Sequence, residues 1–392
     1  MIWNWEQPDW PHFTWDATRL ERAERAFLLA AGSLQGTVKH LPETDRTQLS
    51  IESMSSEAVT TSAIEGETLS RESVQSSIRR RLGLADAASP RRAKPSEDGI
   101  GELMIDLYQR FAEPLDHDTL FRWHRMLTAG RTDLADVGRY RTHEGPMQIV
   151  SAGSTEPDVR FEAPPSARVP AEMDRFVAWF NSTSPDGSRP LPALCRAGVS
   201  HVYFESVHPF EDGNGRIGRA IAEKALAQSL GRPSLTAIAA TILRYRSEYY
   251  RSLEAASRHN ELTGWLMWFG GITLEAQQRT LAEVEFLIDK ARLLDAHRDG
   301  LNERQMAALL RMLREGPDGF KGGLSAGNYI AITKTSTPTA TRDLAEMVRL
   351  GVLTRTGERR HTRYHLAIPL RAVPRMVIDG DGGIVSGTAT VG

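Results

Sequence analysis

The feature that most constrains the fold is residues 208–219 (HPFEDGNGRIGR), which lie between two stretches with helical periodicity. Residues 193–207 place apolar side chains near one face of a predicted helix. Pro209 ends this helix, because proline lacks an N–H and clashes with the preceding turn. Gly213 and Gly215 permit a tight turn, and a second helix is predicted to begin near Gly215. The segment therefore predicts a helix, a glycine loop and a helix.

The residues of this loop favour an anion site beside a base. The start of a helix offers unpaired N–H groups and the positive end of its dipole. The amide of Asn214 can donate, and Arg216 and Arg219 are three residues apart, on one side of the helix. Asp212 is a hard oxygen ligand, suited to an Mg²⁺ that bridges two phosphates. His208 is placed to take a proton from an attacking hydroxyl.

Segment 208–219 resembles the Fic family signature, His-Pro-Phe-x-Asp/Glu-Gly-Asn-Gly-Arg-x-x-Arg, at every defined position. The resemblance implies a mainly α fold with a Fic-type helical core. It also implies transfer of AMP from ATP to a Ser, Thr or Tyr hydroxyl of a target protein or of the chain itself, with release of pyrophosphate. Related Doc kinases carry a lysine near Gly215, so the glycine here favours nucleotidyl transfer over phosphoryl transfer.

The same resemblance implies individual roles. His208 would be the catalytic base and Asp212 the Mg²⁺ ligand, with Arg219 reaching the γ-phosphate. The residues implied to bind ATP are Gly213, Asn214, Gly215, Arg216, Ile217, Gly218 and Arg219.

A second motif precedes the first by more than a hundred residues. Thr61-x-x-x-Glu65-Gly66 is similar to the inhibitory motif of Fic proteins, Ser/Thr-x-x-x-Glu-Gly/Asn. We expect Glu65 at the C-terminal end of a helix, because Gly66 suits a helix stop. If Glu65 pairs with Arg219, the γ-phosphate loses its arginine and meets a carboxylate. The motif therefore predicts self-inhibition.

Two further segments resemble parts of a Fic core. A predicted helix at 241–258 is similar to the helix that contacts adenine: Tyr250 matches the base-contacting tyrosine, and Ser257 stands where some members have Asn. A predicted β-hairpin within 138–170 lies where Fic proteins carry a flap that aligns an extended target segment by main-chain pairing. His124, on an apolar helix face, is interpreted as a buried core residue.

Four regions are predicted. Residues 1–98 form a Trp-rich helical module with the inhibitory helix, and its tryptophans are expected to pack onto the body of the protein. Residues 99–298 form the Fic core, 299–368 a winged helix, and 369–392 a disordered tail. Residues 300–364 hold 11 Lys/Arg and 6 Asp/Glu, a surplus that suits phosphate contacts. DNA binding, protein docking and homodimer formation through this region all stay open.

Composition narrows the class of protein. The single cysteine, Cys195, cannot form an internal disulfide, which favours a reducing compartment. No apolar run has the length of a membrane span, and the net charge of −2 gives no global signal for nucleic acid. We expect a cytoplasmic enzyme without membrane contact. The open alternatives are a de-AMPylase in which Glu65 positions water, a DNA-binding regulator with a nucleotide-sensing core, and a metal hydrolase. The hydrolase ligands would be His201, Glu205, His208 and Asp212.

Overall fold

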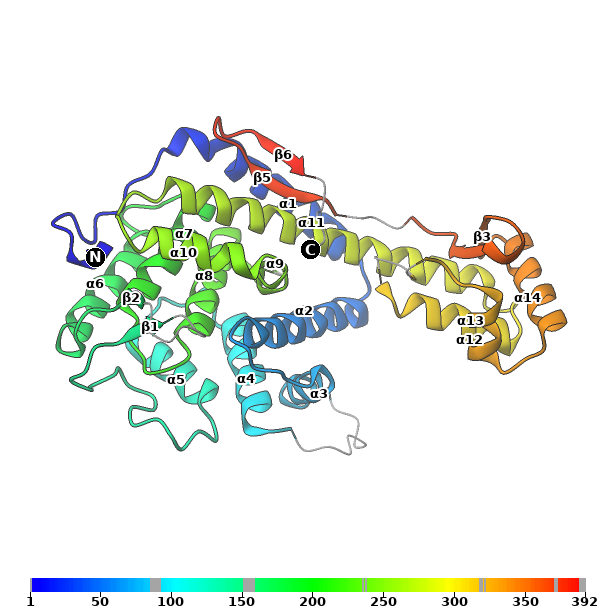
Figure 1. Ribbon diagram of the computed structural model, residues 1–392, viewed down its shortest axis with the longest axis horizontal. Coiled ribbons are helices and arrows are strands. Elements are labelled where there is room, and N and C mark those ends of the chain that lie inside the picture. The colour runs from blue at the N-terminus through cyan, green and yellow to red at the C-terminus, as the bar shows by residue number, and fades with distance from the viewer. Residues whose placement is uncertain are drawn as a thin grey trace. The chain divides into compact units, whose positions relative to one another are not determined.

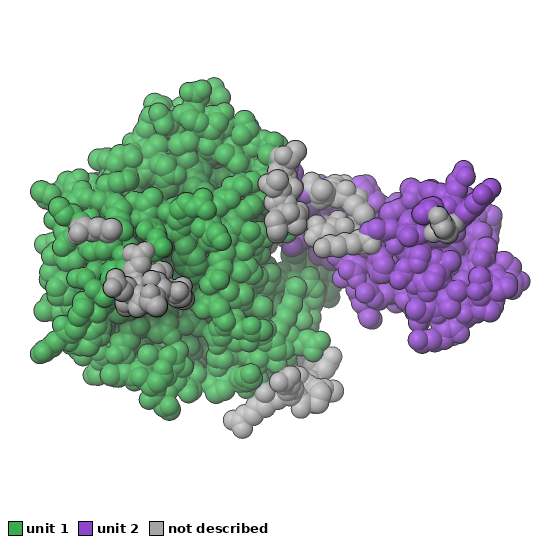
Figure 2. All heavy atoms as spheres, in the orientation of Figure 1, with its two compact units in different colours: residues 1–277, 375–392 green, residues 278–374 purple. Residues whose placement is uncertain are grey.

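The protein is described by a computed structural model that covers residues 2–84, 93–150, 159–234, 236, 238–316, 320, 322–369 and 373–387. The predicted mainly helical fold is confirmed (Figure 1). The chain divides into two compact units, of which unit 1 holds residues 1–277 and 375–392, and unit 2 holds residues 278–374 (Figure 2). Within the described ranges, none of the helices combines the length and apolar character needed to cross a membrane.

Unit 1 contains the predicted N-terminal module and residues 99–277 of the predicted core, whereas residues 278–298 of that core belong to unit 2. Its 3-10 helices are η1 (Asn4–Glu6), η2 (Ala17–Arg19) and η3 (Ser166–Arg168). Its hairpins pair β1 (Gln148–Val150) with β2 (Val159–Glu162), and β5 (Arg375–Ile378) with β6 (Ile384–Gly387). Its helices are α1 (Glu21–Lys39), α2 (Glu43–Ile64), α3 (Arg71–Arg81), α4 (Pro95–Gln109), α5 (His117–Leu127), α6 (Val169–Ser182), α7 (Ala193–Val207), α8 (Asn214–Leu230), α9 (Ile238–Arg244), α10 (Arg246–Ala256) and the first part of α11 (Thr263–His297).

Helices α7 and α8 form the centre of unit 1 (Figure 1). Every residue of α7 is buried, as expected of a helix that is surrounded by others on all sides. α8 begins after Gly213, whose φ of 85° lies in the left-handed region that glycine adopts without strain. Phe204 of α7, Phe210 of the loop and Ile217 of α8 are fully buried. The connecting loop is therefore held by core packing at both ends.

The N-terminal tryptophans pack onto this core, as predicted. Trp3 and Trp5 are buried, and the Trp3 ring meets Phe161 of β2 edge-on, with 5.3 Å between ring centroids. The indole N–H of Trp5 donates to the carbonyl of Glu162, also in β2, at 2.7 Å. The N-terminal arm therefore supports the hairpin β1–β2.

Two helices depart from the sequence analysis. Within the N-terminal module, the Gly, Ala, Ser, Pro and Arg content of residues 79–98 favours a linker or exposed loop, but Arg79–Arg81 belong to the last turn of α3 and residues 95–98 to the first turn of α4. The Ser70 side chain caps α3. The buried face of α3 is small, so the hydrophobic periodicity of this helix is weak in the sequence. The helix expected over 241–258 is divided into α9 and α10 near Tyr245. Residues 85–92 of the predicted linker and 151–158 of the predicted hairpin lie outside the described residues.

The predicted disordered tail instead contains the antiparallel hairpin β5–β6. Ile378 is buried, and the hairpin lies against Gly270 and Gly271 of α11. A Cβ atom on Gly271 would come within 2.7 Å of the Met376 carbonyl oxygen. Arg375 forms an ion pair with Glu248 of α10. The glycine pair thus makes room for a strand that Gly- and Ser-rich composition alone did not predict.

Unit 2 holds the rest of α11, then α12 (Glu303–Leu313), α13 (Ala326–Thr333) and α14 (Thr337–Arg349), and the hairpin of β3 (Leu353–Thr356) with β4 (Arg363–Leu366), which encloses η5 (Arg359–His361). Asp343 is buried and accepts hydrogen bonds from Tyr329 at 3.0 Å and Arg304 at 2.9 Å. The order of elements is the one a winged helix requires, but assignment of that fold stays a prediction. The core of this unit includes Leu309, Met312, Leu344, Met347, Leu353 and Leu366.

Two carboxyl groups meet between α2 and α8, and a cavity of about 40 Å³ lies beside them. One oxygen of Glu57 accepts from the Ala239 N–H at 2.8 Å, and Glu223 accepts from the Ser234 hydroxyl. The other oxygen of each is buried and finds no hydrogen-bond partner in the described structure. Burial and the neighbouring Glu223 raise the pKa of Glu57 to about 8, and burial raises the pKa of Glu223 to about 7.

These raised pKa values predict a pH-dependent stability. A glutamate in the unfolded chain ionises near its ordinary pKa of 4.5, whereas folded Glu57 keeps its proton up to pH about 8. Stability is therefore lost as pH rises through this window. We expect Glu57→Gln to melt close to wild type at pH 5 and a few degrees above it at pH 8, measured by calorimetry. An equal difference at both pH values would contradict the assignment, and Glu52→Gln, on the same helix, is the control.

Candidate active site

His208 follows directly on α7 with a left-handed backbone, φ 49°. It is almost buried, and its Nδ1 lies 3.6 Å from the Glu205 carboxylate. Its carbonyl accepts from Nε of Arg141 at 2.8 Å, while the Arg141 N–H donates to the Pro209 carbonyl at 2.9 Å. Arg141 was not predicted as a site residue, because its partners at the loop, His208 and Pro209, lie more than sixty positions away in the sequence. These contacts fix the backbone on which the candidate base sits.

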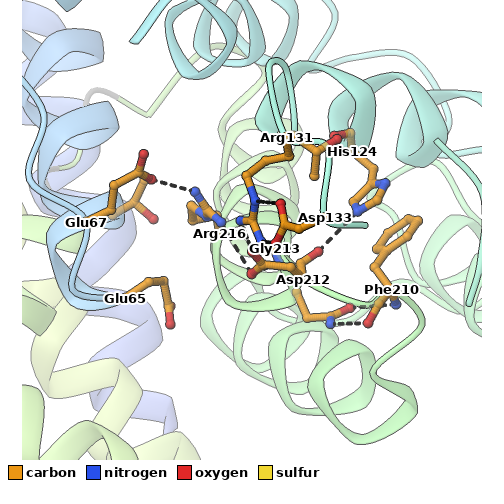
Figure 3. A network of polar contacts seen from close by, with 12 residues as sticks. Glu65, Glu67, His124, Arg131, Asp133, Phe210, Asp212, Gly213 and Arg216 are labelled. Atoms are coloured by element: carbon orange, nitrogen blue, oxygen red, sulfur yellow. Dashed lines mark hydrogen bonds and ion pairs between the residues drawn. The ribbon is translucent and has the colours of Figure 1, made fainter. Parts of the chain in front are cut away.

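The rest of the loop is closed by its own residues (Figure 3). The Asn214 amide accepts from the Phe210 N–H at 3.0 Å and donates to the Phe210 carbonyl at 2.8 Å. The sequence predicts that this amide donates to a phosphate, but in the structure its oxygen and one of its N–H groups bond to Phe210. The His124 ring stacks on Phe210, with centroids 4.3 Å apart. One hydrogen of the amide nitrogen and the backbone N–H of Asn214 therefore remain for the predicted anion site.

His124 is buried, as predicted. Its Nδ1 accepts from the Gly138 N–H at 2.9 Å, so Nε2 carries the proton and donates to the Asp212 carbonyl at 3.2 Å. Burial lowers the pKa of His124 to about 4. A neutral histidine therefore helps to hold the loop at Asp212.

The start of α8 forms one wall of the site. The first helical N–H groups have no carbonyl to bond within the helix, and the Ile217 N–H is the first to bond back, to Gly213 at 3.0 Å. The Ile217 side chain is fully buried, and Gly218 lies beside Glu205 and His201. Ile217 and Gly218, which were both predicted to bind ATP, therefore contribute to core packing. The backbone N–H groups of the residues before Ile217 are the ones available to an anion.

Asp212 lies between two arginines, as Figure 3 shows. Its carboxylate accepts from Arg131 at 2.6 Å and from Arg216 at 3.5 Å. Burial by itself would raise the pKa of Asp212, but Arg216 and Arg131 outweigh it and hold the pKa below its usual value. The carboxyl group of Asp212 is therefore ionised.

This carboxylate fits the implied Mg²⁺ ion. Magnesium in phosphoryl and nucleotidyl sites is commonly held by one or two carboxylates together with substrate phosphates. Across the residues that the structure describes, no group of three or more His, Cys, Asp or Glu side chains is arranged to hold a metal. His201 bonds instead to the Tyr249 hydroxyl, at 2.9 Å, so the metal-hydrolase alternative has no support in the described residues.

Arg219 lies in contact with the last two turns of α2. Its Nη2 donates to the Glu65 carboxylate at 2.7 Å and to the Thr61 carbonyl at 2.9 Å, and its Nε donates to the Thr61 hydroxyl at 2.7 Å. Burial would lower the pKa of Arg219, but Glu65 outweighs this and keeps the arginine charged. Gly215 makes room for the pair, because a Cβ there would collide with the Glu65 carboxylate. The contact expected from the sequence is thus present.

A second carboxylate of the same segment pairs with the other arginine. Glu67 follows Glu65 after the turn at Gly66 (φ 86°), and its Oε2 lies 2.8 Å from Nη1 of Arg216 (Figure 3). This contact was not predicted from the sequence, since no family motif covers Glu67. Its position two residues after Glu65, across a glycine turn, was the available signal. Both arginines of the loop are therefore paired with one short segment after α2.

A cavity of about 560 Å³ opens between the hairpin β1–β2, α7 and α10. Tyr250 and Ser257 both line it. The Tyr250 hydroxyl donates to the Ile64 carbonyl at 3.0 Å, which joins the cavity wall to the end of α2. The Ser257 hydroxyl donates to the Glu254 carbonyl at 2.8 Å, so it is already engaged. Glu205 also lines the cavity, which therefore reaches the neighbourhood of His208.

Comparison with known proteins places this site in a family. Residues 114–226 match the Fic/DOC family, and residues 3–84 match a domain of unknown function, DUF4172. The chain therefore carries a Fic/DOC-family domain, and α7, the loop and most of α8 lie within it. Glu65 and Glu67 belong to the DUF4172 segment.

Two curated relatives are similar to part of the chain. The chain is 28% identical over 155 residues to protein adenylyltransferase fic-1 of Caenorhabditis elegans, covering 40% of this chain and 27% of that protein. It is 27% identical over 165 residues to protein adenylyltransferase Fic of Nematostella vectensis, covering 41% and 33%. The match thus spans only about a quarter to a third of these relatives' length.

Among solved structures, a Fic-domain-containing signalling protein from Bacteroides thetaiotaomicron has a TM-score of 0.52. The similarity covers 67% of this chain and 97% of that one, with 19% sequence identity. This likeness supports the fold of the domain.

Proposed function

We propose that the protein is an adenylyltransferase that transfers AMP from ATP to a hydroxyl group of a protein side chain. The observation that carries this proposal is the juxtaposition at one loop of His208, ionised Asp212 and the open start of α8 with its two arginines. The names of the curated relatives support the same reaction. The target protein is defined here only by its class, a side chain with a hydroxyl.

In this mechanism the protein positions groups and neutralises charge. The target hydroxyl oxygen bonds to the α-phosphorus, the bond from that phosphorus to the bridging oxygen breaks, and pyrophosphate leaves. His208 takes the hydroxyl proton. The N–H groups at the start of α8 hold the phosphates, and Arg216 and Arg219 offset their charge once they are free. Mg²⁺ at Asp212 would neutralise phosphate charge.

The cavity beside the loop is large enough for the nucleoside. Its volume of about 560 Å³ lies within the usual range for small-molecule sites. Tyr250 offers an aromatic face there, which suits a purine. The exposed strand β1 offers main-chain groups to an extended target segment. The nucleotide and the target would thus approach His208 from neighbouring sides.

Glu65 and Glu67 give this activity a built-in restraint. While they pair with Arg219 and Arg216, neither arginine is available to phosphate, and a bound phosphate would meet two carboxylates. We propose that the DUF4172 segment inhibits the Fic domain of the same chain in this way. A signal that displaces residues 65–67 would release both arginines together.

The proposed function is tested with ATP labelled at the α-phosphate or at the γ-phosphate. Protein label is expected from α-labelled ATP and not from γ-labelled ATP, and His208→Ala should reduce it by at least about a hundredfold, the usual scale for loss of a general base. His259→Ala, an exposed histidine on the same unit, is the matched control. Label from the γ position would indicate phosphoryl transfer instead. Release of AMP from a modified target by wild type, but not by Glu65→Gly, would indicate a de-AMPylase.

A further inference from the structure

Glu205 faces the candidate base from inside the core. It lies three residues before His208, in the last turn of α7, and its side chain is 8% exposed. Its Oε2 is 3.6 Å from Nδ1 of His208. Nδ1 is itself buried and has no hydrogen-bond partner in the described ranges. The left-handed backbone of His208 allows a side chain to follow the end of α7 and yet lie close to its final turn.

We infer that Glu205 is the positioning residue of His208: its carboxylate keeps the proton on Nδ1, which leaves Nε2 free to accept the proton of the target hydroxyl. This inference rests on the role proposed for His208 as the base. It assigns the tautomer on which that role depends.

The tautomer follows from the charges. A neutral imidazole carries its proton on one nitrogen and a lone pair on the other. With the proton on Nε2, the lone pair of Nδ1 would face a carboxylate in a buried setting, and no donor would satisfy either group. With the proton on Nδ1, the carboxylate gains a donor and the nitrogen an acceptor. The distance of 3.6 Å between Nδ1 of His208 and Oε2 of Glu205 is longer than a hydrogen bond. Hydrogen bonds between catalytic groups are often this long before substrate binds.

The surroundings of Glu205 keep it ionised and fixed. Burial would raise the pKa of Glu205, but contact with His208 and the charge of Arg219 outweigh burial, so the pKa of Glu205 is lowered. Gly218 of α8 makes room for the carboxylate, because a Cβ there would lie 2.8 Å from Oε1 of Glu205 and 3.1 Å from Nδ1 of His201. A glycine at position 218 is thus needed for the Glu205 carboxylate to occupy this place.

The test reads the tautomer directly in the full chain. With ¹⁵N-labelled histidine, nuclear magnetic resonance reports which ring nitrogen of His208 carries the proton, and His208→Gln identifies the signals. We expect Nδ1–H in wild type and a shift toward Nε2–H in Glu205→Leu. In the transfer assay, kcat should fall at least tenfold while KM for ATP changes less than twofold, and Glu205→Asp should restore part of the loss. Glu223→Leu, another carboxylate with an unpartnered buried oxygen, should leave the His208 signals unchanged.

The outcomes are separable. An unchanged Nδ1–H tautomer in Glu205→Leu overturns the inference, even if activity falls. The resonance measurement needs no activity, so it decides the point even if AMP transfer is not observed. If thermal melting shows that Glu205→Leu does not fold, Glu205→Asp and Glu205→Gln take its place: a His208 tautomer identical to wild type and a kcat within twofold of it in both would equally overturn the inference.

Discussion

Glu65→Gly is expected to raise AMP incorporation from α-labelled ATP by about tenfold or more, within the usual range for coupling between two sites. In the structure the Glu65 carboxylate accepts from Nη2 of Arg219 at 2.7 Å, beside Gly215 at the start of α8. Removing the carboxylate takes a negative charge from the place where phosphate must lie. The Thr61 contacts to Arg219 remain, so the arginine stays near its position and becomes available.

Glu67 allows the two contributions to be separated. Because Asp212 still lies 3.5 Å from Arg216 when Glu67 is neutral, we expect Glu67→Gln to activate less than Glu65→Gly. The double variant should exceed both. Glu43→Gly, at the exposed opposite end of α2, controls for loosening of the helix. A Glu65→Gly rate equal to wild type, in protein whose labelling depends on His208, would reject self-inhibition.

Arg141→Met is expected to lower the stability of unit 1 by about 3–5 kcal/mol, the range for breaking a buried charged network. The guanidinium is 2% exposed. It donates to the carbonyls of His208 at 2.8 Å, Pro164 at 2.5 Å and Val207 at 3.4 Å, and to the Ser166 hydroxyl at 2.9 Å. Methionine fills part of the space and leaves these acceptors buried without a donor.

Activity should fall together with stability in Arg141→Met, because the His208 carbonyl loses its partner. The midpoint of thermal unfolding is expected about 6–20 °C below wild type, from 2–4 °C per kcal/mol for chains of this order of size. Arg189→Met is the control, since Arg189 is exposed and makes one long side-chain hydrogen bond, 3.5 Å to Ser182. A shift in Arg141→Met no larger than the control would show that the network contributes little.

The sequence predicted what depends on local pattern. Pro209 and Gly213 interrupt a helical pattern where α7 ends and α8 begins, so the order of helix, loop and helix could be predicted. The Glu65–Arg219 contact was predicted because both residues lie in motifs of one family. The direction of the Asn214 amide was not, because a free donor and one bonded to Phe210 look alike in sequence.

What could not be predicted depends on distant partners. Arg141 is one arginine among many until Val207 and His208 are brought beside it. Glu67 and Glu205 carry no special sequence signal of their own, and each is defined by a neighbour at the loop. The hairpin β5–β6 forms because Gly270 and Gly271 leave room on α11. The composition of a segment shows how polar it is, but it does not show which surface of the folded protein the segment packs against.

The packing of Trp3 and Trp5 limits the ways in which the proposed inhibition by Glu65 and Glu67 can be relieved. The segment that brings Glu65 and Glu67 to the arginines also brings Trp3 and Trp5 to β2, beside the proposed target-binding edge. A deletion of residues 1–84 would therefore remove the inhibitor and a structural support in one event, and we expect it to produce an unstable enzyme rather than an active one. Point changes at residues 65–67, or a ligand that moves them while the tryptophans stay in place, are the routes that keep the fold intact. We therefore expect no gain of AMP transfer in a chain that lacks residues 1–84.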